Sequence, residues 1–180
     1  MPIYISLLRG INVSGQKKIN MKELQAMYES LKFKNVKTYI QSGNVIFETS
    51  ESSTLSLQKK IEKKIEEVFS FDVVVFCYSI QEWKKIIKAN PFTKEDTGRI
   101  YVTLLADATT AKPMDDINKV KHELEKIHID KKSIYFFCPT GYGQSKLSNN
   151  FFERKLKTSA TTRNWKTMDT LLTLAEEKTK

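Results

Sequence analysis

Arginine is scarce in this sequence, although positive charge is not. Only four of the 30 basic side chains are arginine, and three of them, Arg9, Arg154 and Arg163, lie in short polar motifs. A guanidinium offers carboxylates and phosphates a planar fork of donors, whereas an ammonium is a mobile, strongly hydrated point charge. The sequence therefore marks three positions where a fork of donors is needed, either for an anionic ligand or for internal ion pairs.

Cysteine and histidine are also rare, with two residues of each. Cys77 and Cys138 each lie within an apolar run, so we expect buried thiols in a reducing, cytoplasmic compartment rather than a disulfide. His122 and His128 lie outside every polar motif, and no cluster of Cys, His and Asp has the spacing of metal ligands. We therefore expect neither a metal site nor a cofactor.

The polar motifs are poor in groups that transfer protons. They contain one carboxylate, Glu153, and no histidine or cysteine. General acid–base catalysis needs a positioned His, Asp or Glu. Hydrolytic and metal-dependent chemistry are therefore disfavoured, and the sequence favours a protein that is not an enzyme without excluding one.

Long apolar runs are absent. No segment approaches the roughly 18–20 apolar residues of a membrane-spanning helix, and the start of the chain, Met1–Tyr4, lacks the basic region and cleavage site of a secretory signal. With 180 residues, 40% of them hydrophobic, the chain is long enough for one domain or two small ones. We expect it to fold by itself and to have no membrane partner.

The net charge of +9 is unevenly distributed. The segment from Lys146 to Lys166 contains six basic residues and one acid, and so carries +5 of that charge. A focused basic patch favours an anionic partner such as a phosphate, a nucleotide or a nucleic acid. Elsewhere, as in residues 58–64, acids and bases alternate as they do on a solvated helix face.

The first half of the sequence predicts a ferredoxin-like unit. The predicted elements are a strand at 3–8, a helix begun by Asn20, strands at 36–42 and 45–49 joined by a two-residue turn at Gly43 and Asn44, a helix at 54–69 with Leu57, Ile61, Ile65 and Val68 toward the core, and a strand at 73–78. The turn residues and the helical spacing of apolar side chains carry these assignments. The order β-α-β-β-α-β is that of the split βαβ motif.

The second half partly repeats this order. The predicted elements are a helix begun by Ser79 and ended at Asn90-Pro91, a strand at 100–105, a helix from Pro113 with Ile117, Val120, Leu124 and Ile127 toward the core, a strand at 134–138 paired with a short one near 127–130, and helices at 147–156 and 165–176. This half reads β-α-β-β-α, with a helix where the closing strand would be.

These elements predict an α+β fold. An N-terminal ferredoxin-like βαββαβ unit at 1–78 would pack against a second, related βαββα half at 79–180 that ends in two helices. No low-complexity linker separates the halves, so we expect them to share an interface.

Four segments stand out as motifs: Tyr4–Val13 (YISLLRGINV), Thr38–Phe47 (TYIQSGNVIF), Ser145–Leu147 (SKL) and Ala160–Trp165 (ATTRNW). They resemble the motifs of a bacterial family catalogued as domain of unknown function 1697, and the resemblance spans nearly the whole chain. Ser14 and Phe33 depart from the family's pattern without touching the polar core of the motifs. The resemblance implies an α+β fold and a small cytoplasmic protein, but no activity, because the family has no established function.

The first candidate binding site is Arg9–Asn12, at the end of the first predicted strand. Gly10 allows a positive φ or a close approach of the backbone. Arg9 would clamp an anion, with Asn12 as a polar reader. Alternatively, Arg9 pairs with a carboxylate or with carbonyls at a helix end and locks the loop.

The second candidate is the hairpin tip that contains Gln41, Ser42 and Asn44. The tip would present an amide, a hydroxyl and backbone groups to a ligand. Gly and Asn are also what a tight turn requires, and we favour that interpretation for Gly43 and Asn44. The turn explains Gln41 less well.

The third candidate is the loop that carries Ser145 and Lys146 after Gly141. Backbone N–H groups at the start of the following helix would hold an anion, and Lys146 would add charge. The spacing is not that of a P-loop. A flexible connector with a Ser cap is the competing interpretation.

The fourth candidate comprises Arg154, Arg163 and Asn164. Arg163 is the strongest candidate here for a ligand contact, whereas Asn164 or Thr162 would also serve as the cap of the last helix. The neighbouring aromatic residues are expected to be core rather than stacking platforms.

We therefore expect a non-catalytic module that binds a phosphate-bearing ligand, a nucleotide or a nucleic acid, through Arg9, Lys146, Arg154 and Arg163. Gln41 and Asn12 would read polar groups of the ligand. One alternative is an enzyme that acts on a small anionic substrate, with Glu153 or a tyrosine as proton carrier. Another is a structural or protein-interaction role, in which the arginines form internal ion pairs. The sequence does not indicate an oligomeric state.

Overall fold

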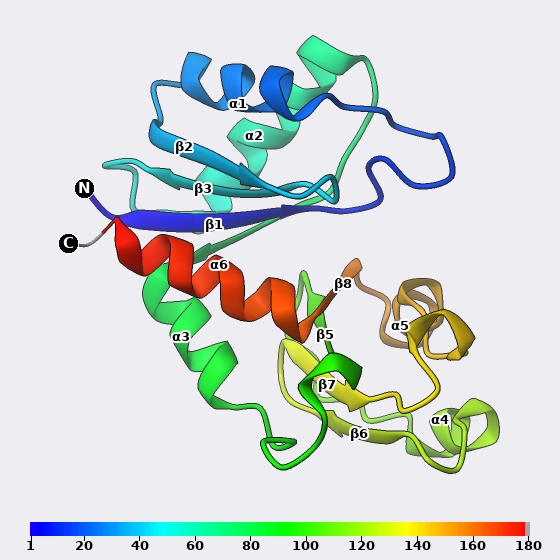
Figure 1. Ribbon diagram of the computed structural model, residues 1–180. Helices are drawn as coiled ribbons and strands as arrows, with labels where there is room; N and C mark the ends of the chain where they lie inside the picture. Colours follow the sequence, from blue (N-terminus) through cyan, green and yellow to red (C-terminus); the bar gives the residue numbers. More distant parts are fainter. Residues whose placement is uncertain (179–180) are drawn as a thin grey trace. The chain divides into compact units, whose positions relative to one another are not determined.

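The computed structural model describes residues 1–178 and divides into two compact units. One unit comprises Met1–Lys85 together with the chain from Thr170 onward, and the other comprises Ile86–Asp169. Each unit contains one four-stranded antiparallel sheet (Figure 1). The predicted α+β class with two similar halves is confirmed. The division of the chain into domains at 1–78 and 79–180 stays a prediction.

The first unit has the predicted order of elements. These are β1 (Ile3–Leu8), α1 (Met21–Ser30), β2 (Lys34–Tyr39), β3 (Asn44–Glu48), α2 (Thr54–Phe69), β4 (Val75–Ser79) and the first part of α3 (Ile80–Lys88). The strands lie in the order β2-β3-β1-β4, so β1 is central. Helix α1 begins after Asn20, whose Oδ1 accepts a hydrogen bond of 2.8 Å from the Lys22 N–H, as the capping signal predicts.

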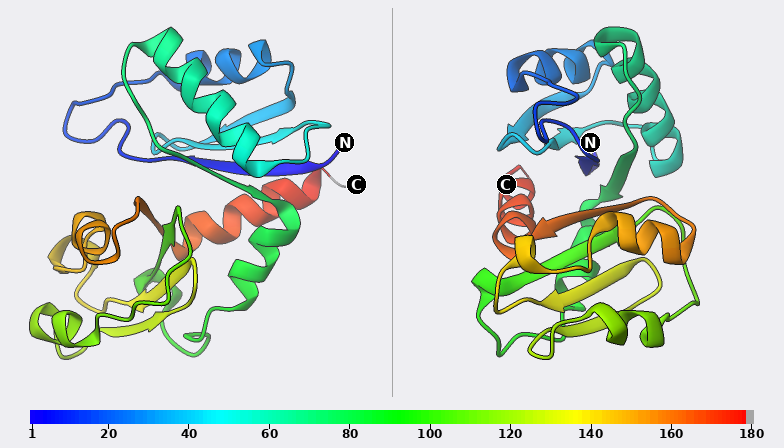
Figure 2. Two further views of the ribbon diagram at one scale, coloured as in Figure 1. Left: turned by 180° about the vertical axis from the view of Figure 1, so that it is seen from behind. Right: turned by 90° about the vertical axis from the view of Figure 1, so that its right-hand side faces the viewer.

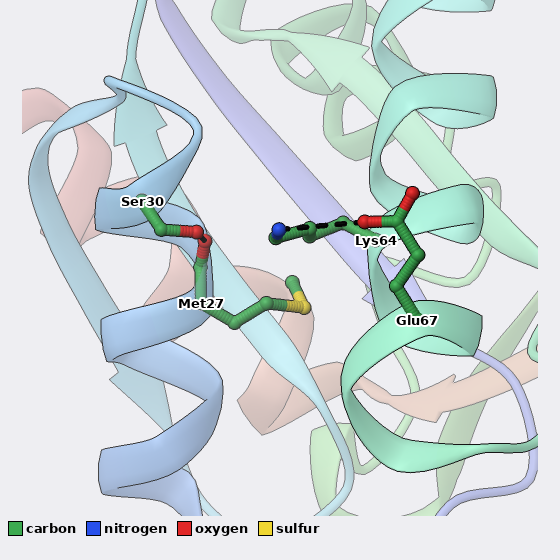
Figure 3. Close-up of polar contacts among 4 residues, drawn as sticks. All are labelled: Met27, Ser30, Lys64 and Glu67. Atoms are coloured by element: carbon green, nitrogen blue, oxygen red, sulfur yellow. Dashed lines mark hydrogen bonds and ion pairs between the residues drawn. The ribbon is translucent and has the colours of Figure 1, made fainter.

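Helices α1 and α2 cover one face of this sheet (Figure 1). Leu57, Ile61 and Ile65 of α2 are fully buried against that face. Val68 was predicted to join them, but it is 49% exposed. Phe69 packs against the core instead, because it continues the four-residue spacing of the stripe. On the polar side of α2, Lys64 forms an exposed ion pair with Glu67, and on α1 the Ser30 hydroxyl donates to the Met27 carbonyl (Figure 3).

The second unit repeats the arrangement of the first. Its elements are β5 (Ile100–Leu105), α4 (Met114–Val120), β6 (Lys126–Ile129), β7 (Ser133–Phe137), α5 (Asn149–Leu156), β8 (Ala160–Asn164) and the first part of α6 (Trp165–Glu177), with short 3₁₀ turns at Thr97–Arg99 and Tyr142–Gln144. The strand order is β6-β7-β5-β8. Phe151 and Phe152 of α5 lie in the core of this unit, as predicted, and α5 covers one face of its sheet (Figure 2).

The prediction that the second half lacks a closing strand is wrong. Ala160–Asn164 forms β8, which pairs with β5 in antiparallel register from Leu105↔Ala160 to Tyr101↔Asn164. The segment is short and polar, so it carries no apolar alternation that would predict a strand. Its β-branched threonines suit a strand once β5 supplies the partner.

The two sheets share equivalent backbone hydrogen bonds at the end of their central strands. The Arg9 N–H donates to the Val74 carbonyl at 3.0 Å, and the Ala106 N–H donates to the Ser159 carbonyl at 2.9 Å. Both bonds lie one residue beyond the last pair of the central ladder. The closing strands also end alike, because each passes directly into a helix. Arg9 and Ala106 therefore occupy equivalent positions in the two units.

The predicted two-residue turn at Gly43 and Asn44 is also wrong. Tyr39 pairs with Asn44, so the connection comprises the four residues 40–43 and Asn44 opens β3. The buried Asn44 side chain donates to the Tyr39 carbonyl and to Ser42 Oγ, both at 2.9 Å. These bonds close the wider turn.

Helix α4 is shorter than predicted. It ends at Val120, and Lys121 is already extended. Leu124 is 56% exposed and Ile127 lies in β6. The buried Glu125 carboxylate accepts a hydrogen bond from the His122 N–H, which stabilises a turn in place of further helix. Within residues 1–178, no helix is both long and apolar enough to cross a membrane.

We expect Gly43→Ala to destabilise the first unit strongly. Gly43 has a φ of +79°, and an added Cβ would lie 2.7 Å from Ile11 Cδ1 and 2.8 Å from Leu8 Cβ. Left-handed strain and overpacking together predict a loss of about 3 kcal/mol in the free energy of unfolding, measured by urea denaturation. Gly10→Ala is the matched control, because Gly10 has a φ of +70° with no atom within 4 Å of an added Cβ. It should cost only about 1 kcal/mol, and equal losses would contradict the close approach at Gly43.

Candidate functional site

A surface cavity of about 450 Å³ lies in the first unit, where β1 ends and β4 begins. It is lined by Arg9 and Lys17 of the loop after β1, by Lys59, Glu62, Lys63 and Glu66 of α2, and by Asp72, Val73 and Val74 before β4. Three segments that are distant in the sequence thus contribute four basic and three acidic side chains to one cavity. A volume of this size suits a small molecule.

The sheet holds Arg9 at the edge of this cavity. Leu8 is the last residue of β1 in the ladder with β4, where it pairs with Val75. The Arg9 N–H then donates to the Val74 carbonyl at 3.0 Å. The backbone of Arg9 is therefore fixed by the sheet, while its half-buried side chain reaches the cavity.

Helix α2 brings two lysines to the cavity. Lys59 and Lys63 are four residues apart and so lie on the same helix face. Within residues 1–178, neither ammonium group has a hydrogen bond or an ion pair. Lys64, on another face of α2, is instead neutralised by Glu67 at 3.4 Å (Figure 3). Helix α2 therefore supplies the cavity with two ammonium groups that no ion pair within residues 1–178 neutralises.

Two of the remaining charged residues tie the walls together. Glu62 Oε1 accepts a hydrogen bond of 2.9 Å from the Val75 N–H and so holds α2 against the start of β4. Lys17 Nζ donates to the Asp72 carbonyl at 2.5 Å, which fixes the loop after β1 beside the turn before β4. Glu66 and Asp72 are exposed acids at the rim.

Asn12 holds the loop after β1 together. Its side-chain amide donates to the carbonyls of Ile19 (3.1 Å) and Gln41 (2.8 Å), and its Oδ1 accepts from the Ile19 N–H at 2.9 Å. Both amide hydrogens are thus used inside the protein, and the residue has a left-handed φ of 54°. The hydrogen bond from Asn12 to the Gln41 carbonyl joins the loop that follows Arg9 to the hairpin that contains Gln41. Asn12 therefore has a structural role.

The hairpin tip does not reach the cavity. Gln41 is exposed and offers its carbonyl to Asn12, while Ser42 and Asn44 bond to each other in the turn. None of these three predicted site residues lies among those that line the cavity. Turn geometry accounts for Asn44, as the sequence favours.

Ser145 and Lys146 lie in the second unit, before α5. The cap of α5 is Ser148, whose Oγ accepts from the Phe151 N–H at 3.2 Å, so the prediction of a helix start at 147 places the start of α5 two residues too early. Ser145 Oγ accepts from the Leu147 N–H at 3.1 Å in the preceding loop. Lys146 is exposed. The positive end of the helix is therefore displaced from the predicted anion site.

Arg154 and Arg163 differ sharply in environment. Arg154 is exposed, and its guanidinium carbon lies 5.9 Å from the centre of the Phe151 ring, a cation–π contact. Arg163 is only 9% exposed, and its Nη1 donates to Thr161 Oγ1 and to the Thr162 carbonyl, both at 2.9 Å. Burial lowers the pKa of Arg163 to about 10. These contacts support a structural role for Arg163 within β8.

The basic segment near the C-terminus contains further structural residues. Lys155 forms an ion pair of 3.1 Å with Asp116. Asn164 Oδ1 accepts from the Thr167 N–H at 2.8 Å and so caps α6, in agreement with the capping interpretation. Glu153 Oε1 accepts from the Ala160 N–H at 2.9 Å, which ties α5 to β8. The +5 charge of this segment thus includes several groups that serve the fold.

The thiols are poor nucleophiles. Cys77 and Cys138 are free and buried. Burial is the main reason that the pKa of Cys138 is raised to about 12, and it also raises the pKa of Cys77. Among the side chains of residues 1–178, no group of three His, Cys, Asp or Glu is arranged to hold a metal ion.

Sequence reasoning missed most of the cavity. Lys59 and Lys63 were assigned to a solvated helix face, and Lys17, Glu66 and Asp72 lie outside the chosen motifs. One signal was available: Lys59 and Lys63 are like charges at the i,i+4 spacing, which destabilises a helix slightly unless another contact compensates.

Comparisons with known proteins give a family and a fold. A family model described as "Protein of unknown function (DUF1697)" matches residues 1–135, which confirms the resemblance seen in the motifs. The solved structure of the conserved bacterial protein SP0830 from Streptococcus pneumoniae is 24% identical and covers 97% of this chain and 98% of that one, with a TM-score of 0.73. At this identity the likeness shows the fold alone. No curated protein matches the chain.

We expect Arg163→Ala to lower the free energy of unfolding by about 3 kcal/mol, because it truncates a buried side chain and removes two hydrogen bonds. Arg154→Ala is the matched control and should cost less than about 1 kcal/mol, since it removes an exposed cation–π contact. Urea denaturation of both variants checks this. Similar losses would contradict the structural role of Arg163.

We also expect both thiols to be unreactive in the folded protein. Native protein at pH 8 should release almost no thionitrobenzoate from Ellman's reagent, because burial disfavours the thiolates and blocks access. Protein unfolded in guanidinium chloride should show both thiols. Rapid reaction of one thiol in the native protein would contradict the burial of that thiol.

Proposed function

We propose that this chain, which belongs to the DUF1697 family of proteins of unknown function, is a non-catalytic module that binds a phosphate-bearing ligand in the cavity around Arg9. The observation that carries the proposal is the convergence of Arg9, Lys17, Lys59 and Lys63 on one cavity. A guanidinium fork combined with two ammonium groups that form no ion pair within residues 1–178 suits a phosphate, which offers several acceptor oxygens.

The repeat within the chain supports a functional origin for this charge. Ala106 occupies the position in the second unit that Arg9 occupies in the first. The next residue, Asp107, bonds to the Thr158 hydroxyl and closes the adjacent loops. The same scaffold therefore folds without an arginine at this point.

The cavity favours a small ligand over a nucleic acid. Glu62, Glu66 and Asp72 line it together with the basic residues, and three carboxylates would repel a continuous phosphate backbone. Non-specific nucleic-acid binding depends on an extended basic surface that displaces many counterions. A single phosphate group needs only a few of the basic side chains, and Arg9, Lys59 and Lys63 line the same cavity.

The enzyme alternative gains less support. It predicts that Arg9, Gln41 and Arg163 line one open cleft with a carboxylate in reach, yet neither Gln41 nor Arg163 is among the lining residues of the cavity. The suggested proton carrier Glu153 bonds to the Ala160 N–H in the second unit. A structural role has a specific observation in its favour for Arg163, which is buried in β8.

Calorimetric titration with inorganic phosphate and pyrophosphate tests the proposal. Arg9→Ala should weaken binding at least tenfold, and Lys59→Ala and Lys63→Ala should each weaken it roughly three- to tenfold, because each removes a charge-assisted contact. Lys64→Ala is the matched control on the same helix, since Lys64 already pairs with Glu67. Its affinity should equal that of the wild type. The proposal fails if neither anion binds, or if the control loses as much affinity as the Lys63 variant.

A further inference from the structure

The acidic side of the cavity needs an explanation that a phosphate alone does not supply. Glu66 and Asp72 line the cavity, and within residues 1–178 neither carboxylate has a hydrogen bond or an ion pair. A bare phosphate gains nothing from two carboxylates and is repelled by them. An ionised carboxylate accepts hydrogen bonds and donates none. A ligand that exploits the whole cavity must therefore carry donors beside its anionic group.

The spacing of the charges indicates neutral donors. Glu66 lies three residues after Lys63, and Glu62 lies three residues after Lys59, so each acid on α2 has a lysine as its neighbour on the helix surface. A cationic amine placed against Glu66 would also approach the Lys63 ammonium. A hydroxyl group donates to the carboxylate without that repulsion.

The apolar part of the cavity is small. Among residues 1–178, Val73 and Val74 are the only apolar residues that line it, and Val73 is buried. No aromatic side chain of this described part of the chain lines the cavity. Stacking of a nucleobase on an aromatic ring is a principal source of affinity for bases, and this cavity offers no such ring.

From this combination we infer that the ligand is a small sugar phosphate. Its phosphate binds Arg9, Lys59 and Lys63, and its hydroxyl groups donate to Glu66 and Asp72. The inference rests on the proposed function and deepens it, because it assigns the hydroxyl groups of the ligand to the acidic residues. The base of a nucleotide has no place in this arrangement.

Titrations with ribose 5-phosphate, glucose 6-phosphate, inorganic phosphate and AMP test the inference. At least one of the sugar phosphates should bind about tenfold more tightly than inorganic phosphate, through two additional hydrogen bonds to charged acceptors. AMP should bind no more tightly than ribose 5-phosphate. The double variant Glu66→Ala/Asp72→Ala should lose the advantage of the sugar phosphate while binding inorganic phosphate at least as tightly, because two negative charges are removed.

Glu67→Ala is the matched control, since Glu67 lies next to Glu66 but pairs with Lys64. This variant should change neither the affinity for inorganic phosphate nor the affinity for the sugar phosphates. If inorganic phosphate binds in an Arg9-dependent manner but both sugar phosphates bind no more tightly, the inference fails and the proposed function stands. If AMP binds with much higher affinity than ribose 5-phosphate, the inference also fails, and the ligand is a nucleotide rather than a sugar phosphate. If no anion binds at all, the proposed function itself fails.

Discussion

The pairing of β1 between β3 and β4 is the constraint on which the first unit depends. Ile5 pairs with Ile46 on one side and with Tyr78 on the other, and all six residues of β1 are buried. A shift of one residue would exchange the two faces of the strand. The pairing with β3 on one side and β4 on the other therefore fixes the register, and the register specifies where the strand ends. Arg9 follows that end directly, so the burial of the strand positions the guanidinium.

The second unit shows what the scaffold requires and what it does not. It keeps the strand order and the register of the central strand. It also keeps the backbone hydrogen bond donated by the first residue after that strand, which is Ala106 here and Arg9 in the first unit. It does not keep Arg9. At the equivalent position, Asp107 and Thr158 close its loops through hydrogen bonds. One fold thus carries two different surfaces at equivalent positions, as expected when function depends on residues added to a stable scaffold.

Predictions from the sequence succeeded where the signal is local. Asn20 caps α1 and Asn164 caps α6, because a side-chain oxygen reaches an N–H two or three residues away. Helix α2 has the predicted bounds, since its apolar spacing matches one helix face. The closing strand β8 was missed because Thr161 and Thr162 carry no apolar alternation, and only the edge of β5 gives them a partner.

Taken by itself, the sequence determined the order of most elements and the family, because capping, periodicity and motifs are properties of neighbouring residues. Only the tertiary structure decided what surrounds Arg9. Lys59 and Lys63 line the same cavity as Arg9 because Glu62 holds α2 against β4, a contact between segments far apart in the chain. It likewise decided that Arg163 is buried within β8, while Arg154 stays exposed. Residues that meet across such distances leave no pattern along one sequence, since packing of the intervening elements brings them together.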